Sequence, residues 1–113
     1  MIQQRAPLSI LSCQSGLYFA QKVEKELVSK YGINVHLIAS SQVIFANTEI
    51  KTVIEESIRG RDVYIIQDVE NHTEGMSVDQ NLRAIYTTID ACRRCGAERI
   101  TAILPSYPYA RQD

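Results

Sequence analysis

Two apolar runs separated by an amphipathic stretch constrain the fold of this chain more than any other feature. The run DVYIIQ at residues 62–67 is β-branched, aromatic and nearly continuous, as expected for a strand covered on both faces. RITAILP at residues 99–105 predicts a second strand. Between them, apolar residues recur at helical spacing and a glycine follows where a helix C-cap belongs. These residues are Leu82, Ile85, Tyr86, Ile89 and Cys92, then Gly96.

The first forty residues repeat this alternation. LSILS at residues 8–12 predicts a buried strand, and QSG after it suits a turn. Residues 16–31 predict a helix that ends before Gly32, and residues 34–40 predict another strand. Strand–helix–strand units of this kind predict an α/β fold with a mostly parallel sheet flanked by helices. The apolar spacing within the first helix is carried by Ala20, Val23, Leu27 and Tyr31.

The segment SQVIFANTEIKTVIEESIRG, residues 41–60, breaks the alternation. Its apolar pattern is partial, so we expect a strand or hairpin that projects from the main sheet, with FANTE at its turn. Lys51 and Thr52 are expected to be exposed. Such a β-arm would also expose Ile44, Phe45 and Ile50, and exposed apolar surface favours a contact with a partner. A long polar loop is expected over residues 68–80.

Composition excludes several classes of protein. The chain has 113 residues, which fits one domain, and a net charge of −1, which offers no basic field for nucleic acid or an anionic membrane. No apolar run approaches membrane-spanning length. Three scattered cysteines form a poor disulfide framework, so a reduced, cytoplasmic setting is expected. Cys92 and Cys95 spell C-x-x-C, yet Cys92 falls on the apolar stripe of the second helix, which favours a structural role.

Three polar clusters are candidates for a binding site. Each also has a structural interpretation: Arg111 could be a solvated surface residue, Phe45 a core contact, and Arg59 a partner of a nearby glutamate. The residues alone leave both interpretations open. The clusters are Phe45, Asn47 and Glu49, an aromatic beside an amide and a carboxylate that suits a purine; Ser57 and Arg59, which suit an anion; and Arg111, Gln112 and Asp113, which suit a phosphate with a base or metal-bound water.

Longer motifs then identify a resemblance. IEESIRGRDVYIIQ at residues 54–67, IDACRRCGAERITAILPSYPYARQD at residues 89–113 and the F-x-N-x-E pattern of the arm closely resemble the amino-terminal half of ribose-phosphate pyrophosphokinase, also called phosphoribosyl pyrophosphate synthetase. The resemblance covers residues 8–113. It implies a phosphoribosyltransferase-like fold and an enzyme that transfers the diphosphoryl group of ATP, with Mg²⁺, to ribose 5-phosphate. It also implies a homo-oligomer, a dimer or hexamer, with ATP between subunits.

The resemblance also assigns roles to the three clusters. It implies that Phe45, Asn47 and Glu49 pack on the adenine, that Arg111, Gln112 and Asp113 of another subunit contact the nucleotide, and that Ser57 and Arg59 belong to a regulatory phosphate or ADP site.

Residues 1–113 are therefore expected to form the amino-terminal nucleotide-binding domain of a longer enzyme. The catalytic residues, the metal ligands and the ribose-phosphate loop would lie beyond it, so these residues are expected to be inactive alone. The alternatives are a non-catalytic regulatory subunit associated with such a synthetase, and a small α/β sensor that shares the strand pattern.

Overall fold

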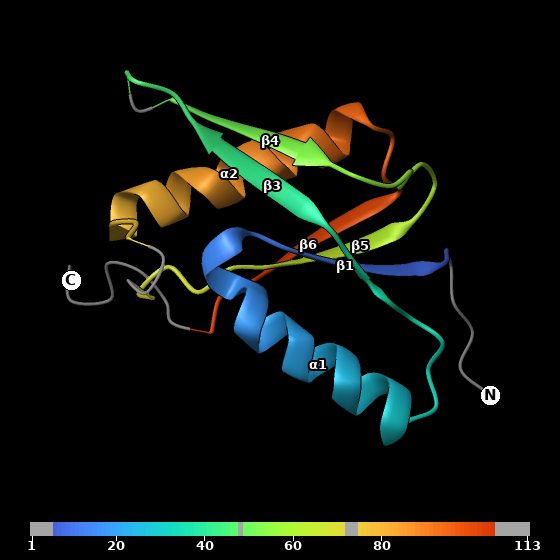
Figure 1. Cartoon of the computed structure of the whole chain (residues 1–113). Helices are drawn as coiled ribbons and strands as arrows, with labels where there is room; N and C mark the ends of the chain where they lie inside the picture. Colours follow the sequence, from blue (N-terminus) through green and yellow to red (C-terminus); the bar gives the residue numbers. More distant parts are fainter. Residues whose placement is uncertain (1–5, 48, 72–74, 106–113) are drawn as a thin grey trace, which may run out of the picture.

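A four-stranded parallel sheet with one long helix on each face forms the body of the protein, and a two-stranded antiparallel arm packs beside it (Figure 1). The computed structural model describes residues 6–47, 49–71 and 75–105. The α/β fold and the projecting β-arm expected from the sequence are confirmed. In chain order the elements are β1 (Leu8–Ser12), the 3₁₀ turn η1 (Gln14–Gly16), α1 (Leu17–Ser29), β2 (Leu37–Ile38), β3 (Ser40–Ile44), β4 (Ile50–Ile54), β5 (Asp62–Ile66), α2 (Val78–Arg94) and β6 (Arg99–Ile103).

In the strand order β2-β1-β5-β6 all strands are parallel, but the direction in which the chain adds strands reverses at the centre of the sheet. The chain moves outward from β1 to β2 through α1, and outward the other way from β5 to β6 through α2. Because parallel crossovers are right-handed, the two helices cover opposite faces. The topological switch point therefore lies between the carboxyl ends of β1 and β5, where Ser12 pairs with Ile66.

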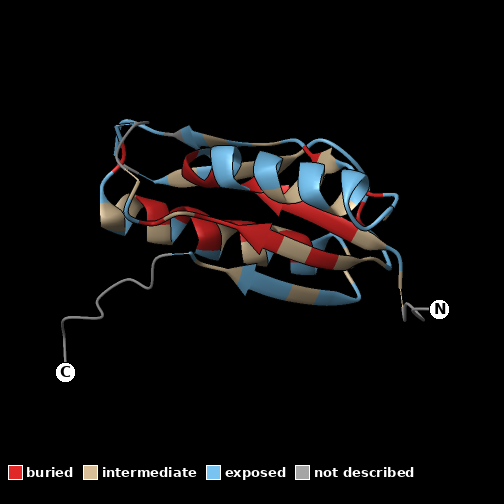
Figure 2. Cartoon of the chain, turned by 90° about the horizontal axis from the view of Figure 1, so that it is seen from below, coloured by how far each residue is buried: buried red, intermediate tan, exposed pale blue. Residues whose placement is uncertain are grey.

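Each helix closes its own hydrophobic cluster against the sheet. On the α2 face, Leu11, Val63 and Ile65 pack with Ile85 and Cys92. The α1 face holds a smaller cluster of Ile10, Ala20, Val35 and Ile66. Figure 2 shows the buried residues concentrated in the central strands, whereas β6 at the sheet edge is largely exposed.

The arm follows the predicted hairpin, but its inner face was predicted incorrectly. β3 pairs with β4 in antiparallel register from Ser40 opposite Ile54 to Ile44 opposite Ile50, and the turn falls between them. Ile50 is partly buried and packs, like Ile54, against the α2-side cluster. Thr52, expected to be exposed, is partly buried and hydrogen-bonds to α2. The side chain of Ile44 lies outside what the structure describes.

Three element boundaries also differ from the sequence predictions. Residues 34–40 form only the two-residue strand β2 before β3 begins, although Val35 is buried as an apolar residue should be. The second helix begins at Val78, inside the segment expected to be loop. Tyr31 lies beyond the end of α1 and is 66% exposed, so it is not part of the apolar stripe. The glycines that follow each helix, Gly32 and Gly96, have the expected positive φ angles of 63° and 84°.

A buried polar network fills the switch point. The Ser15 hydroxyl donates to Asn81 Oδ1 at 2.7 Å, and Asn81 Nδ2 donates to the carbonyls of Val69 at 2.9 Å and Asn71 at 3.1 Å. Gln67 Nε2 donates to the Asn81 carbonyl at 3.0 Å. These bonds tie η1, the loop after β5 and the first turn of α2 into one rigid unit at the carboxyl edge of the sheet.

Candidate functional site

The turn of the arm presents three of the predicted site residues together. Phe45 N–H donates to the Glu49 carbonyl at 2.8 Å, and Glu49 N–H donates to Asn47 Oδ1 at 3.2 Å. This side-chain bond from an asparagine to the backbone two residues on is a common way to fix a tight turn. The Phe45 side chain remains 48% exposed. Its interpretation as a core contact is therefore wrong.

The first turns of α2 lie opposite this turn. Ser77 caps the helix: its hydroxyl accepts from Gln80 N–H at 3.1 Å, and Gln80 Oε1 accepts from Ser77 N–H at 2.9 Å. Asp79, Arg83 and Thr87 follow at intervals of four residues, which places them on one side of the helix.

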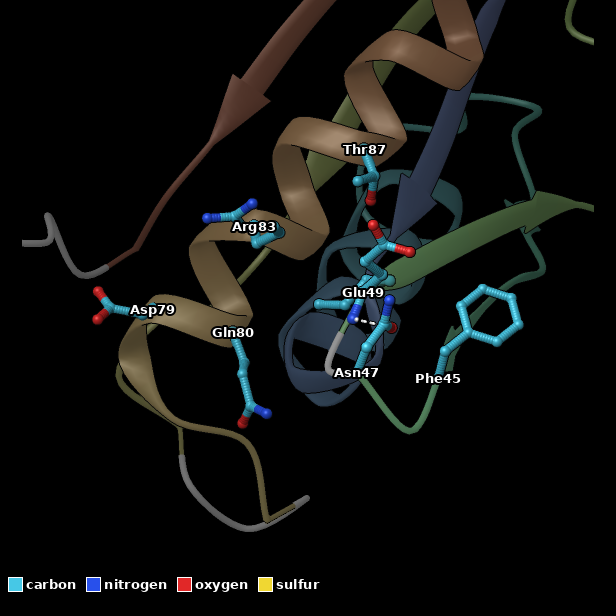
Figure 3. Close-up of a pocket in the computed structure, with 8 residues that line it drawn as sticks. Phe45, Asn47, Glu49, Asp79, Gln80, Arg83 and Thr87 are labelled. Carbon is cyan, nitrogen blue, oxygen red and sulfur yellow. Dashed lines mark hydrogen bonds between the residues drawn. The ribbon is translucent and has the colours of Figure 1, made fainter.

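Between the turn and α2 lies an open cavity of about 620 Å³. Figure 3 shows Glu49 extending toward Thr87, whereas the Phe45 ring and the Arg83 guanidinium point away from each other. In the described part of the chain, Arg83 forms no ion pair. An aromatic face, an amide, two carboxylates and a guanidinium around one cavity suit a polar aromatic ligand. The lining residues are Phe45, Asn47, Glu49, Ile50, Asp79, Gln80, Arg83 and Thr87.

Sequence reasoning did not find the residues that α2 contributes. Asp79 and Gln80 fall at the end of the segment expected to be loop, whereas Arg83 and Thr87 lie in the predicted helix, between the apolar residues that define it. Their common face has meaning only once the helix start is known. The S-x-x-Q pattern of Ser77 to Gln80 was the available signal, because it is a capping box. It would have placed Asp79 and Arg83 on one helical face.

The Ser57–Arg59 cluster lies at the opposite end of α2. Gly60 N–H donates to the Gly96 carbonyl at 2.8 Å, so this turn sits beside the helix C-terminus. α2 has 17 residues, and a helix of that length spans about 25 Å. Ser57 and Arg59 are exposed, and no ion pair joins Arg59 to either neighbouring glutamate in the described residues. The structure therefore does not bring this cluster to the arm cavity.

The cluster of Arg111, Gln112 and Asp113 lies outside the described residues. The strand that leads to it ends at Ile103, at the same carboxyl edge as the first turn of α2. The chain therefore leaves the sheet on the side where the arm cavity is formed.

The structural role predicted for Cys92 on the apolar stripe of the second helix is confirmed by its burial. Cys13 and Cys92 are buried and Cys95 is exposed, all three as free thiols. Burial raises the pKa of the Cys13 thiol to about 11 and that of Cys92 to about 12. Both remain protonated at neutral pH and are unsuited to nucleophilic or redox chemistry.

This burial predicts a loss of stability at alkaline pH. The unfolded chain releases the Cys13 proton near its ordinary pKa of 9.0, whereas the folded chain keeps it until about 11, so the free energy of unfolding falls as pH rises across that interval. We expect a loss on the order of 2 kcal/mol from Cys13, measured by urea unfolding at a series of pH values. Cys13→Ser should remove this part, and Cys95→Ser, at an exposed thiol, should retain it. Equal losses in wild type and Cys13→Ser would contradict the prediction.

The fold defines the class of protein. Hypoxanthine-guanine phosphoribosyltransferase of L. donovani superposes with a TM-score of 0.64 over 95% of this chain and 59% of its own, at 11% identity. A likeness at that identity concerns the fold alone, which is of the phosphoribosyltransferase type. The described residues contain no helix long and apolar enough to cross a membrane.

The sequence defines the family within that class. The profile of the N-terminal domain of ribose phosphate pyrophosphokinase matches residues 8–113, and the chain belongs to this family. Ribose-phosphate pyrophosphokinase 1 of Listeria monocytogenes is 40% identical over 106 residues, covering 94% of this chain and 30% of that protein. A phosphoribosylpyrophosphate synthetase from Mycobacterium smegmatis superposes with a TM-score of 0.75 at 36% identity, over 95% of this chain and 32% of its own. The chain thus spans about 30% of the length of the curated relatives it matches.

Proposed function

We propose that this chain is the nucleotide-binding part of a ribose-phosphate diphosphokinase, which transfers the diphosphoryl group of ATP to ribose 5-phosphate. Its membership of the family and its relatives' names support this activity. One structural observation carries the assignment of the nucleotide: the half-exposed ring of Phe45 stands beside Asn47 and Glu49 at the mouth of a cavity.

The arm has the chemistry to hold an adenine. The Phe45 ring offers a face on which a purine can stack. Because Asn47 Oδ1 accepts from Glu49 N–H, the Asn47 amide nitrogen is left to donate to a ring nitrogen of the base. The Glu49 carboxylate can accept from the exocyclic amine.

Arg111 of a neighbouring subunit would hold the phosphates, and Gln112 and Asp113 beside it would contact a polar base or a metal-bound water. A guanidinium fork is suited to phosphate oxygens. In the reaction the anomeric oxygen of ribose 5-phosphate forms a bond to the β-phosphorus, the bond from that phosphorus to the α-phosphate oxygen breaks, and AMP leaves. Such transfers depend mainly on positioning and charge stabilisation, which residues from two subunits together would supply.

Mg²⁺ would accompany ATP. Among the described residues, no group of three or more histidine, cysteine, aspartate or glutamate side chains is placed to hold a metal ion. The distance between the arm cavity and the Ser57–Arg59 turn supports a separate regulatory role for the latter, as an anion site.

A homo-oligomer, a dimer or hexamer, completes the proposal, since the two halves of the nucleotide site come from different copies. The chain alone is expected to bind ATP without forming phosphoribosyl pyrophosphate, because the ribose-phosphate loop is expected outside these residues. Turnover by residues 1–113 alone in a coupled assay would contradict this part of the proposal.

Phe45→Ala tests the adenine assignment. Loss of an aromatic stack of about 1 to 1.5 kcal/mol should weaken ATP binding roughly five- to tenfold, measured by isothermal titration. Tyr86→Ala is the matched control, because Tyr86 is an aromatic residue, 59% exposed, that does not line the cavity. Its affinity should equal that of the wild type. Equal affinity in Phe45→Ala and wild type would remove the arm from the nucleotide site.

A further inference from the structure

A chain of hydroxyl and thiol groups connects the arm to the body of the protein. Thr52 Oγ1 on β4 lies 3.0 Å from Thr87 Oγ1 and 3.2 Å from Thr88 Oγ1, both on α2. Thr88 Oγ1 in turn lies 3.3 Å from Cys13 Sγ, at the carboxyl end of β1. Thr88 and Cys13 are fully buried. These four residues, the arm clamp, thus link the arm, a helix and the central sheet.

The directions of these hydrogen bonds follow from their hydrogens. The hydroxyls of Thr87 and Thr88 donate to the Ala84 carbonyl at 2.9 and 2.8 Å. Each threonine has one hydroxyl hydrogen, so with it directed at the Ala84 carbonyl both oxygens are acceptors toward their other neighbours. In this arrangement Thr52 donates its single hydrogen to Thr87 or Thr88, and the Cys13 thiol donates to Thr88. The raised pKa of Cys13 keeps that hydrogen in place at neutral pH.

Apolar packing alone does not fix the position of the arm along α2, and the arm clamp lies at this contact. Ile50, Thr52 and Ile54 alternate along β4 and share one face of the strand. The two isoleucines pack against the α2-side cluster. This hydrophobic contact holds the arm on the body of the protein, but it is non-directional and favours no particular position along the helix. The hydroxyl between them can bond only where Thr87 and Thr88 present their oxygens. It therefore defines how the arm is seated along the helix.

The same residues border the candidate nucleotide site. Thr87 lines the cavity between the arm and α2, and Glu49 extends toward it in Figure 3. Glu49 is adjacent to the start of β4, three residues from Thr52. A shift of the arm along α2 would therefore change the separation of Glu49 and Phe45 from the helix residues across the cavity.

We propose that Thr52 is a positioning residue. Its hydrogen bonding to Thr87 and Thr88 fixes the position of the arm along α2 and thereby the geometry of the nucleotide cavity. The effect on nucleotide rests on the proposed function, whereas the effect on the arm does not. Thr52 does not itself line the cavity, so it acts through the residues that do.

Thr52→Val and Thr52→Ser separate the hydroxyl from the shape of the side chain. Valine keeps the volume and removes the donor, whereas serine keeps the donor. Amide hydrogen exchange is followed at Phe45 N–H and Glu55 N–H, which are bonded to the carbonyls of Glu49 and Ala39 at the two ends of the arm. In Thr52→Val we expect about fivefold faster exchange at both amides and about fivefold weaker ATP binding, the value of one hydrogen bond.

Thr52→Ser should restore both values, and amides of β5 should exchange at the wild-type rate in both variants. Thr101→Val, the same change at an exposed position of β6, is the control and should alter neither reading. Thr88→Val should give a smaller increase in arm exchange than Thr52→Val, because it removes one of the two acceptors of Thr52 and leaves Thr87.

The outcomes separate the two proposals. Unchanged amide exchange in the arm of Thr52→Val would overturn the positioning role, whether or not the affinity for ATP changed. Faster arm exchange with unchanged ATP affinity would overturn the link to the cavity. If the wild-type chain bound no ATP, the proposed function would fail, while the exchange measurement would still decide whether Thr52 seats the arm. A uniform increase in exchange that includes β5 would indicate general destabilisation and would also overturn the proposal.

Discussion

Replacing Gly16 by alanine is expected to lower the free energy of unfolding by about 3 kcal/mol, although only one methyl group is added. A Cβ at this position would lie 2.6 Å from the Ile66 carbonyl oxygen and 2.8 Å from the Gln67 Cα. Both atoms belong to the backbone at the end of β5, which is held between β1 and β6 by ladder hydrogen bonds. Because the added Cβ would meet backbone atoms, the steric overlap can be removed only by a shift of a central strand or of η1.

Urea unfolding of Gly16→Ala beside Gly32→Ala measures this effect. Gly32 has a φ of 63° with nothing within 4 Å of an added Cβ, so its replacement costs only backbone strain of about 1 kcal/mol. Gly16 has an ordinary φ of −98°, so its larger cost would come from contact alone. A smaller loss in Gly16→Ala than in Gly32→Ala would show that η1 can move away from β5.

Asn81→Ala is expected to cost about 3 kcal/mol through unsatisfied buried groups. The Asn81 side chain is fully buried, accepts from the Ser15 hydroxyl and donates to the carbonyls of Val69 and Asn71. Alanine would leave one donor and two acceptors without this partner, and each such group costs about 1 to 3 kcal/mol when water cannot reach it. The loop after β5 would also lose two of its hydrogen bonds to α2, those from Asn81 Nδ2 to the carbonyls of Val69 and Asn71.

Thermal and urea unfolding of Asn81→Ala are compared with Asn34→Ala, the same change at an exposed position. The control should stay within about 0.5 kcal/mol of the wild type. A loss of similar size in both variants would mean that water satisfies the switch-point groups, and the network would not be a source of stability.

The local sequence predicted the body of the fold because the apolar pattern that identifies each element lies within a few consecutive residues. The near-continuous apolar run at β5 and the helical spacing that ends at Gly96 need no information from elsewhere in the chain. The length of β2 was overestimated because buried residues such as Val35 give the apolar pattern of a strand even where they do not pair with a neighbouring strand. The start of α2 was missed where a capping box, Ser77 to Gln80, was not used.

The site was predicted in part for a related reason. Phe45, Asn47 and Glu49 lie in one short turn, so their combined chemistry is visible in the sequence. The α2 residues across the cavity are brought there by tertiary packing. Thr52 shows the limit most directly: its polarity suggested exposure, but its hydrogen-bond partners are 35 and 36 residues away. Strand alternation with Ile50 and Ile54 would have placed it inward.

The turn of the arm stands clear of both hydrophobic clusters, and its described residues, 45–47 and 49, are all exposed. Extra residues there would add mainly loop-closure entropy, about 0.6 kcal/mol for each doubling of loop length. Under the proposed function, substitutions in this exposed turn would alter nucleotide binding at little cost in folding free energy, whereas changes at Gly16 and Asn81 are expected to destabilise the body of the protein.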